Sequence, residues 1–364
     1  MTTGAPFRSA RCIDQVGGYL SDSNEELFAP NKGCLLLEGL VTISGVGPEK
    51  TDPVEAADDG RDLYGISSWE SRSLLDKLSV AIYWSIVRAG QILVVLLALA
   101  IFVGIGGLNM LSDPVSGLLT AFSILPALVL AGYVWYSDVT ANEPLTLLAA
   151  TFLLGVLTAG FAAVLNGALQ PVFGTLGLVG VILSFYLVVG PVEELVKLLA
   201  VGLYAYNDDR FNAVVDGAVY GAVAGLGFAT IENALYITRA IGEVGGVPLG
   251  LDLIGIGGDI TTTRALAGPG HVVYSAFAGY YLGLAKFNPE NWGPIVVKGL
   301  VIAALIHATY NATVGIGSGL SQAATGLPSL VAAFVYILLY VGFFGVLLFR
   351  KIRRYRDAYR RARA

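Results

Sequence analysis

The sequence predicts an all-α, polytopic membrane protein with about eight transmembrane helices and a small polar cytosolic segment at its N-terminus. Composition gives two reasons. The chain of 364 residues is 55% hydrophobic and only 13% charged, and its mean hydropathy is +0.71, whereas soluble domains carry roughly 25% charged residues. The third reason is the recurrence of apolar runs of about 20 residues, which is the length that crosses a bilayer. The lipid bilayer is therefore the expected environment, and no nucleic-acid partner is expected.

Charge is distributed unevenly along the chain, and this predicts three parts. Residues 1–75 hold twelve acidic and six basic side chains, whereas residues 350–363 hold eight basic side chains and one acidic one. We therefore expect an acidic cytosolic segment over 1–88, a transmembrane domain over 89–349 and a basic cytoplasmic tail over 350–364. The first twenty residues lack the apolar core of a secretory signal, so the acidic segment is expected to stay on the side where it is made.

The transmembrane helices are assigned from the apolar runs in chain order. The link at 241–266, before the sixth run, is long and rich in glycine, and it has room for a short re-entrant segment. The eight expected spans are 91–108, 117–136, 145–165, 176–206, 213–236, 267–285, 295–314 and 330–349.

The orientation follows from basic residues beside the spans, which favour the cytoplasmic side. The arginine-rich tail places the C-terminus inside, and eight spans then place the N-terminus inside as well. Lys77 and Arg88 precede the first span, and Lys286 and Lys298 flank the loop after the sixth, whereas the loop 315–328 has no basic residue. A multi-pass protein of the plasma membrane with both termini in the cytoplasm is the prediction.

Ionisable side chains inside the spans are the first candidates for a functional site. A charge at the centre of a membrane helix costs at least about 2.5–3.5 kcal/mol, so such groups mark function by default. They occur only on four consecutive spans, within about 176–314, and they include both histidines of the chain. The group consists of Glu193, Glu194, Lys197, Asp216, Glu232, His271 and His307.

Depth in the membrane indicates that several of these groups form one site. The Gly190–Pro191 pair predicts that a helical segment starts or bends there, with the glutamates in its first turn. At 1.5 Å per residue, Glu193 lies about 20 Å from the cytoplasmic boundary, His307 about 18 Å and His271 about 21 Å. Glu232 lies about 24–30 Å from it by the same measure.

Helical spacing adds polar partners to these groups. Residues four positions apart share a helix face, which pairs Glu193 with Lys197 and His307 with Asn311. Either pair, taken alone, is also explained by helix-to-helix hydrogen bonding. The Gly217, Gly221, Gly225 series predicts a close helix-packing face, and Asp216 is interpreted as interfacial.

Two histidines with several glutamates support hydrolysis of an amide bond in two ways. Two imidazoles and a carboxylate can hold a zinc ion with an open position, while another glutamate acts as base. Without metal, a glutamate can take a proton from water while a histidine or Asn311 stabilises the oxyanion. The residues alone leave both ways open.

Four motifs on successive spans resemble a known family. "GPVEELVK", "GLGFATIENALY", "GHVVYSAFAGYYLG" and "IHATYNA" occur in this order, and together they are similar to the PrsW family of intramembrane proteases, which is related to the CAAX-endopeptidase membrane proteins. The resemblance covers roughly residues 118–350. The related CAAX-type enzymes have EExxxR, FxxxH and HxxxN/D, whereas this chain has EExxK at 193–197 and a glutamate, Glu232, where FxxxH has histidine. The resemblance implies a metalloprotease that cleaves membrane-anchored protein substrates.

The predicted function is an intramembrane peptidase formed by 89–349, with its catalytic helices at about 176–314. Glu193 is expected to be the general base, Glu194 to support it or to act as a ligand, and Asn311 to stabilise the oxyanion. The predicted ligands of a divalent metal, zinc, are Glu232, His271 and His307.

Two rival functions come from other classes. A proton- or cation-coupled transporter also uses buried glutamates and histidines and helices broken at mid-depth, but no internal repeat relates two halves of this chain. A catalytically silent membrane scaffold would use the acidic N-terminal segment for docking. Loss of ion flux in a Glu193→Gln variant would favour the transporter.

Overall fold

The computed structural model describes residue 54 and residues 64–138, 143–243 and 251–363. The chain divides into two compact units, Met1–Lys77 and Leu78–Ala364. Most of the predicted acidic segment 1–88 lies outside the described residues. Its described part has an isolated bridge between Tyr64 and Ser68.

The regular structure of the described residues is helical, with no strand. The α-helices are α2 (Leu74–Gly104), α3 (Gly107–Ser112), α4 (Pro114–Ser123), α5 (Leu125–Tyr136), α6 (Leu145–Leu169), α7 (Gly177–Ser184), α8 (Gly190–Leu203), α9 (Val214–Glu243), α10 (Leu251–Lys286), α11 (Trp292–Thr325) and α12 (Ser329–Arg363). Three short 3-10 helices and one π-helical turn complete the regular structure of the described residues. The 3-10 helices are η1 (Gln170–Leu176), η3 (Ala205–Asn207) and η4 (Pro289–Asn291), and the π-helical turn is η2 (Phe185–Val189).

The prediction of a polytopic all-α membrane protein is confirmed, but the count of eight spans is not. By length and composition, five helical stretches of the described residues can cross a membrane: Leu74–Gly104, Leu145–Leu203, Val214–Glu243, Pro289–Thr325 and Ser329–Ala362. The pair α4–α5, bent by 45°, makes six if it is one span. The stretch Leu145–Leu203 is counted as one of the five. Within it, α6 and α8 pack against each other, so the chain turns back between these two helices.

The fourth predicted span is interrupted where the Gly190–Pro191 pair indicated. A single π-helical turn, η2, precedes α8, which begins at Gly190 and has proline in its first turn. Proline is tolerated there because the first amides of a helix have no partner within it. Single π-helical turns inside helices are frequent at functional sites. The interruption places Glu193 and Glu194 in the first turns of α8.

The prediction of a loop at 241–266 is wrong for most of that range. α9 continues to Glu243, and α10 is one helix from Leu251 to Lys286 that contains Pro269. Residues 244–250 lie outside the described part. The first turns of a helix of 36 residues thus take the place of the link that had room for a re-entrant segment, and Arg264, which falls within that range, lies inside the helix.

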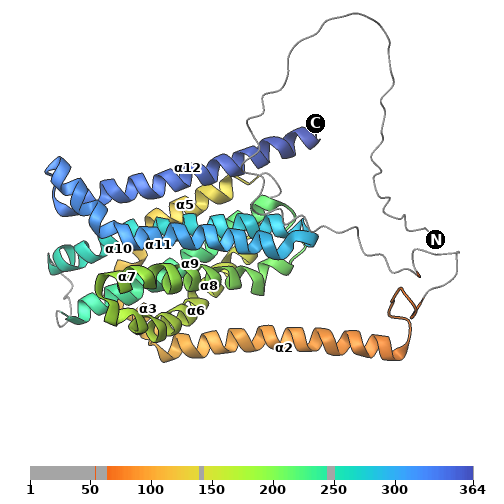
Figure 1. Ribbon diagram of the computed structural model, residues 1–364. Helices are drawn as coiled ribbons and strands as arrows, with labels where there is room; N and C mark the ends of the chain where they lie inside the picture. Colours follow the sequence, from red (N-terminus) through yellow and green to blue (C-terminus); the bar gives the residue numbers. More distant parts are fainter. Residues whose placement is uncertain (1–53, 55–63, 139–142, 244–250, 364) are drawn as a thin grey trace, which may run out of the picture. The chain divides into compact units, whose positions relative to one another are not determined.

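α9 and α10 pack closely along the predicted glycine face. Figure 1 shows these two helices among α5, α8 and α11, and each of those three contacts α10. A methyl group on Gly217, Gly221 or Gly225 would overlap a backbone oxygen of α10, at Gly279, Ser275 and His271 respectively. Glycine is therefore required for this approach, which confirms the predicted packing face. It also brings His271 against α9.

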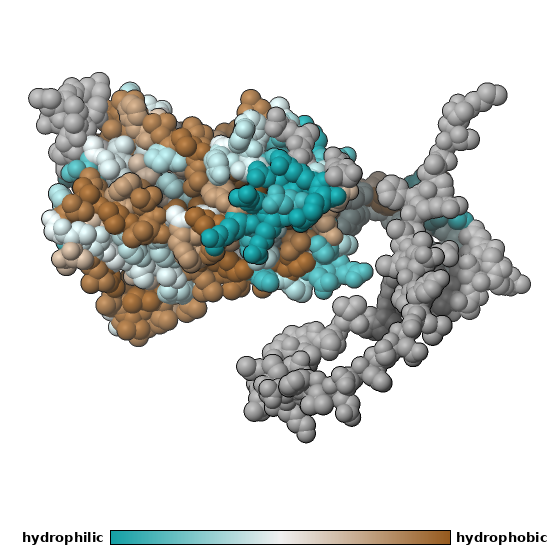
Figure 2. All heavy atoms as spheres, turned by 90° about the horizontal axis from the view of Figure 1, so that it is seen from above, coloured by the Kyte–Doolittle hydropathy of each residue, from teal (hydrophilic) through white to brown (hydrophobic). Residues whose placement is uncertain are grey.

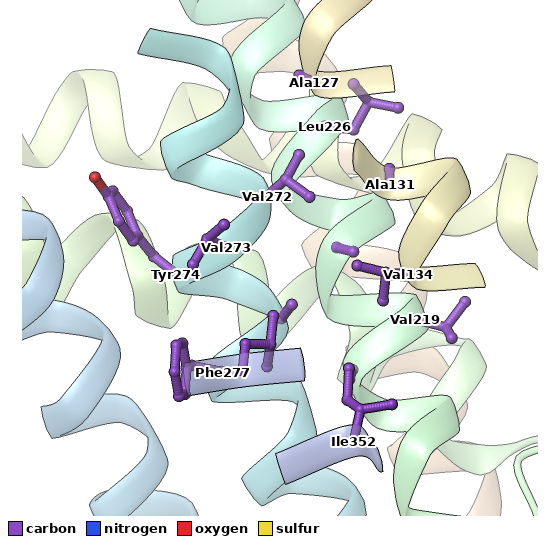
Figure 3. Packing of buried hydrophobic residues seen from close by; sticks show 14 of the residues in the cluster. Ala127, Ala131, Val134, Val219, Leu226, Val272, Val273, Tyr274, Phe277 and Ile352 are labelled. Atoms are coloured by element: carbon purple, nitrogen blue, oxygen red, sulfur yellow. The ribbon is translucent and has the colours of Figure 1, made fainter. Parts of the chain in front are cut away.

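The largest core cluster joins α5, α11 and α12 to the α9–α10 pair. Figure 3 shows Val219 of α9 near Val134 of α5, with Leu226 of α9, Val272 of α10 and Ile352 of α12 in the same cluster. All five are buried. α5 and the basic end of α12 are thus anchored on the two helices that carry Glu232 and His271.

Candidate active site

A cavity of about 430 Å³ lies among α6, α8, α9, α10 and α11. The candidate residues of four different helices reach it. It is lined by Glu193, Glu232, His271, His307 and Asn311, among others. The depth-based prediction that these residues lie together is confirmed by the structure, although their roles stay predictions.

Glu193 is buried and has one oxygen available toward the cavity. Its side chain is 7% exposed, and Oε1 accepts a hydrogen bond of 3.1 Å from the amide of Asn166 on α6. Oε2 is buried without a hydrogen-bond partner among the described residues. This oxygen lies 3.7 Å from Nε2 of His307. An orphaned carboxylate oxygen of this kind is a group that a cation or a substrate would satisfy.

Glu194 is fully satisfied inside the protein. Its Oε1 accepts from Lys197 Nζ at 2.7 Å and lies 2.9 Å from Nδ1 of His307, and its Oε2 accepts from Ser275 Oγ at 3.2 Å. Lys197 also lies over the ring of Phe228, 4.3 Å from its centroid. The salt bridge of Lys197 is thus with Glu194, three residues away. The pairing with Glu193 that the four-residue spacing predicted is wrong, because Glu193 points toward α6 and the cavity.

Glu232 is held by two partners from α10. Its Oε2 accepts from Arg264 at 3.0 Å and lies 2.7 Å from Nε2 of His271. Arg264 also donates to Asn233 at 2.8 Å and stacks over Tyr236. Oε1 of Glu232 has no partner in the described part of the chain. Glu232 therefore remains paired with a guanidinium while one of its oxygens is available.

The two histidines differ in their hydrogen bonding. His307 directs Nδ1 to the carboxylate of Glu194, so Nδ1 carries a proton, and in the neutral imidazole Nε2 has its lone pair and faces Glu193. A metal-binding imidazole usually has this carboxylate support. Nδ1 of His271 lies 3.0 Å from Lys197 Nζ, and an ammonium only donates, so Nδ1 accepts and Nε2 donates to Glu232. His271 can act as a ligand through Nε2 only after that proton has left.

The donor atoms of three of these residues suit a single metal ion. Glu193, His271 and His307 each offer one ligand atom, and the three atoms lie within 4.8 Å of one another. All three residues are buried, and two imidazoles with one carboxylate form a known zinc-binding set. The residues therefore fit a metal. The compact group contains Glu193 in place of Glu232, which was the predicted ligand.

Two contributors to the site were not among the predicted residues. Arg264 was missed because its segment reads as a glycine-rich link, and the signal that could have found it is a lone arginine beside a hydrophobic run. Asn166 was missed because it follows the expected end of the third span. Asn311, in contrast, lines the cavity together with His307, as their four-residue spacing indicated.

Comparison with known proteins shows which family the sequence of this site matches. A family model described as "PrsW family intramembrane metalloprotease" matches residues 143–346, which include every cavity residue named above from Glu193 to Asn311. No solved structure matches the chain significantly.

Named relatives agree with the family match. The chain is 30% identical over 198 residues to "Protease PrsW" of Halalkalibacterium halodurans, which covers 54% of this chain and 82% of the relative. It is 30% identical over 193 residues to the Bacillus subtilis (strain 168) protein of that name, covering 52% and 78%. The Geobacillus kaustophilus protein is 29% identical over 195 residues, covering 53% and 78%.

Proposed function

Because the chain belongs to the PrsW family of intramembrane metalloproteases, and is a membrane-embedded protease of protein substrates, we propose that the cavity among α8–α11 is its active site. One observation carries the proposal: ligand atoms of Glu193, His271 and His307 lie within 4.8 Å of one another at a cavity that also contains Glu232 and Asn311. We further propose that its substrates are membrane-anchored proteins.

Glu193, His271 and His307 would hold the metal, and zinc is the proposed ion because a catalytic zinc is often bound by two histidines and one glutamate. When bound, such an ion polarises a carbonyl group and lowers the pKa of water. The support from Glu194 keeps the lone pair of His307 Nε2 directed toward the site. Glu194 thus acts through His307 and is a positioning residue.

Glu232 is the proposed general base in this arrangement. Arg264 occupies its Oε2, and Nε2 of His271 leaves this oxygen when it binds the metal, so Oε1 is the oxygen that accepts a proton from the attacking water. The carboxyl group then returns this proton to the departing amine. The Asn311 amide donates a hydrogen bond to the oxyanion that forms as water adds to the carbonyl carbon.

The alternative assignment exchanges the two glutamates, with Glu232 as ligand and Glu193 as base. The orphaned Oε2 of Glu193 and the ion pair of Glu232 with Arg264 favour the first assignment. An ion pair with a guanidinium keeps a carboxylate available as a base but competes with a metal for its oxygens.

Metal content and proteolysis separate the two assignments. The full chain is purified, its metal is measured by elemental mass spectrometry, and cleavage of co-reconstituted single-pass membrane proteins is followed. Glu193→Gln should lose both metal and cleavage. Glu232→Gln should keep the metal and lose about 10²–10⁴-fold in rate. Glu290→Gln, a matched change at an exposed position, should keep both.

Two other outcomes are informative. Metal retained in Glu193→Gln but lost in Glu232→Gln would reverse the assignment of the glutamates. Unchanged cleavage in Glu193→Ala, His271→Ala and His307→Ala would rule out the cavity as the active site.

For the location, we propose the plasma membrane with both termini in the cytoplasm. The support is the basic tail that follows the last apolar run, since basic flanks favour the cytoplasmic side. Reporter domains fused after residue 364 should be active only on the cytoplasmic side, and activity on the outer side would reverse the orientation.

A further inference from the structure

A second cavity, of about 250 Å³, lies between the end of α5 and the basic part of α12. It is separate from the proposed active site and shares no lining residue with it. Three arginines of α12 line it, together with aromatic and polar side chains: Arg350, Arg353, Arg356, Phe349, Tyr133 and Ser137.

The three arginines have no acidic partner in the described part of the chain. None of Arg350, Arg353 and Arg356 forms a salt bridge there. The Nε of Arg356 is buried and makes no hydrogen bond with a described residue. A buried donor without a partner costs about 1–3 kcal/mol, and three guanidinium groups around one cavity repel one another. An anion in the cavity would relieve both effects.

The outer face of α12 changes from apolar to basic at this cavity. Leu339, Phe343 and Val346 are 68%, 60% and 50% exposed, and Arg350 and Arg353 continue the same alternating spacing of three and four residues. These five residues therefore share one helix face. Figure 2 shows a hydrophilic area next to a hydrophobic surface on this side of the molecule.

The wall of the cavity is formed by two aromatic rings. Tyr133 of α5 and Phe349 of α12 meet edge to face, with ring centroids 4.7 Å apart. An aromatic ring with a polar tip is typical of the boundary between membrane and water. The cavity thus has an apolar side, which continues along the exposed apolar face of α12, and a cationic side, which the three arginines form.

We propose that this cavity binds the phosphate of an anionic phospholipid, whose acyl chains lie along the Leu339–Phe343–Val346 face. Guanidinium groups bind phosphate oxygens through paired N–H donors, and basic pockets between membrane helices suit anionic headgroups. The lipid joins α12 to α5 at the edge of the core cluster that contains Val134 and Ile352.

The test uses the full-length protein in detergent and measures its thermal unfolding midpoint. Phosphatidylglycerol should raise the midpoint, whereas phosphatidylcholine with the same acyl chains and inorganic phosphate should not. Ligands that bind only the folded state stabilise it in this way. A rise with inorganic phosphate equal to that with phosphatidylglycerol would overturn the lipid assignment in favour of a free anion.

A matched pair of variants separates the cavity from the charge of the tail. R350Q/R353Q/R356Q removes the three lining arginines, and R354Q/R360Q/R361Q removes three exposed arginines of the same helix that do not line the cavity. Native mass spectrometry should show at least tenfold less phosphatidylglycerol retained by the first variant and an unchanged amount on the second. Both variants are compared with the natural protein only in samples that remain folded without added lipid. Equal losses in both variants, or no loss in the first, would overturn the proposal.

Discussion

Two clusters of buried and partly buried carboxylates lie at different places along α9, and they are stabilised in different ways. The active-site cluster contains Glu193, Glu194 and Glu232, and basic side chains from α8, α10 and α11 surround it. The second, which we call the acidic cluster, consists of Asp138, Glu143 and Asp216 near the first turn of α9, with ligand atoms within 4.8 Å of one another.

In the acidic cluster, backbone amides and a phenol satisfy Oδ2 of Asp216 and Oε2 of Glu143, whereas Oε1 of Glu143 is buried without a hydrogen-bond partner among the described residues. Oδ2 of Asp216 accepts from the amides of Asn212 and Ala213 at 2.7 and 2.8 Å, and Glu143 accepts from Tyr220. Asp216 is fully buried and occupies the first turn of α9, where the helix dipole favours an anion. This arrangement stabilises the start of a helix.

In the active-site cluster, the carboxylates have side chains as their hydrogen-bond partners, most of them charged or histidine side chains. Glu194 has three partners, Glu232 has two, and Glu193 keeps one oxygen without a partner toward the cavity. The comparison shows that burial of acids is not itself a mark of catalysis. Each cluster holds one buried carboxylate oxygen that no described residue satisfies, and the two imidazoles beside that of Glu193 are the feature that distinguishes the proposed site.

The largest expected effect on stability is in the active-site cluster. Lys197→Met leaves Glu194 buried without its cation, and breaking a buried pair from one side costs about 3–5 kcal/mol. Thermal unfolding in detergent should show this loss. The double variant Glu194→Gln with Lys197→Met should be more stable than the single lysine variant, since no uncompensated charge remains. A single variant as stable as the natural protein would show that the pair is not buried as described.

A smaller effect is expected at the start of α9. Asp216→Ala removes the acceptor of two backbone amides, and loss of such a helix-capping side chain costs about 0.5–2 kcal/mol. The variant should unfold earlier, whereas cleavage per folded molecule should stay unchanged. Loss of cleavage in a sample that is still folded would mean that the two clusters are coupled.

The sequence allowed the active-site cluster to be predicted better than the acidic one. Counting residues from the ends of the spans placed Glu193, His271 and His307 at one depth, because helices rise at a fixed rate. The partner of Lys197 was not predictable, since residues three and four positions away both share its face. Neighbouring helices decide between them, and a single sequence does not contain their rotation.

Arg264 and Asp216 show the same limit at two other places. Arg264 pairs with Glu232 because α10 starts about ten turns before its last residue, in a stretch whose glycines favoured a loop. Asp216 was interpreted as interfacial from its position near a helix end. Its complete burial depends on residues far away in the sequence, such as Glu143, which lies beside it.

A still smaller effect concerns the response of the acidic cluster to pH. Burial raises the pKa of the Glu143 carboxyl to about 8, against the hydrogen bond from Tyr220, which lowers it. A carboxyl whose pKa is higher in the folded state stabilises that state most at low pH, and this contribution is lost as the pH rises from about 4.5 to about 8. The unfolding midpoint should therefore fall over this range, and less so in Glu143→Gln. An identical slope in both proteins would contradict this.

The smallest expected effect is at an exposed pair on the link before α9, which contrasts with both buried clusters. Arg210 donates to Asp208 at 2.7 and 2.9 Å and holds the pKa of that carboxyl down to about 2. Any contribution is present above the ordinary pKa of aspartate and is lost as the pH falls toward 2. Exposed pairs contribute about 0–1 kcal/mol, because water and salt screen them. Asp208→Asn should therefore change the unfolding midpoint at neutral pH hardly at all. A fall in the unfolding midpoint as large as that of Asp216→Ala would mean that Asp208 supports the link through the packing of its neighbours. Exposure alone would then not explain why this pair contributes less than the buried clusters.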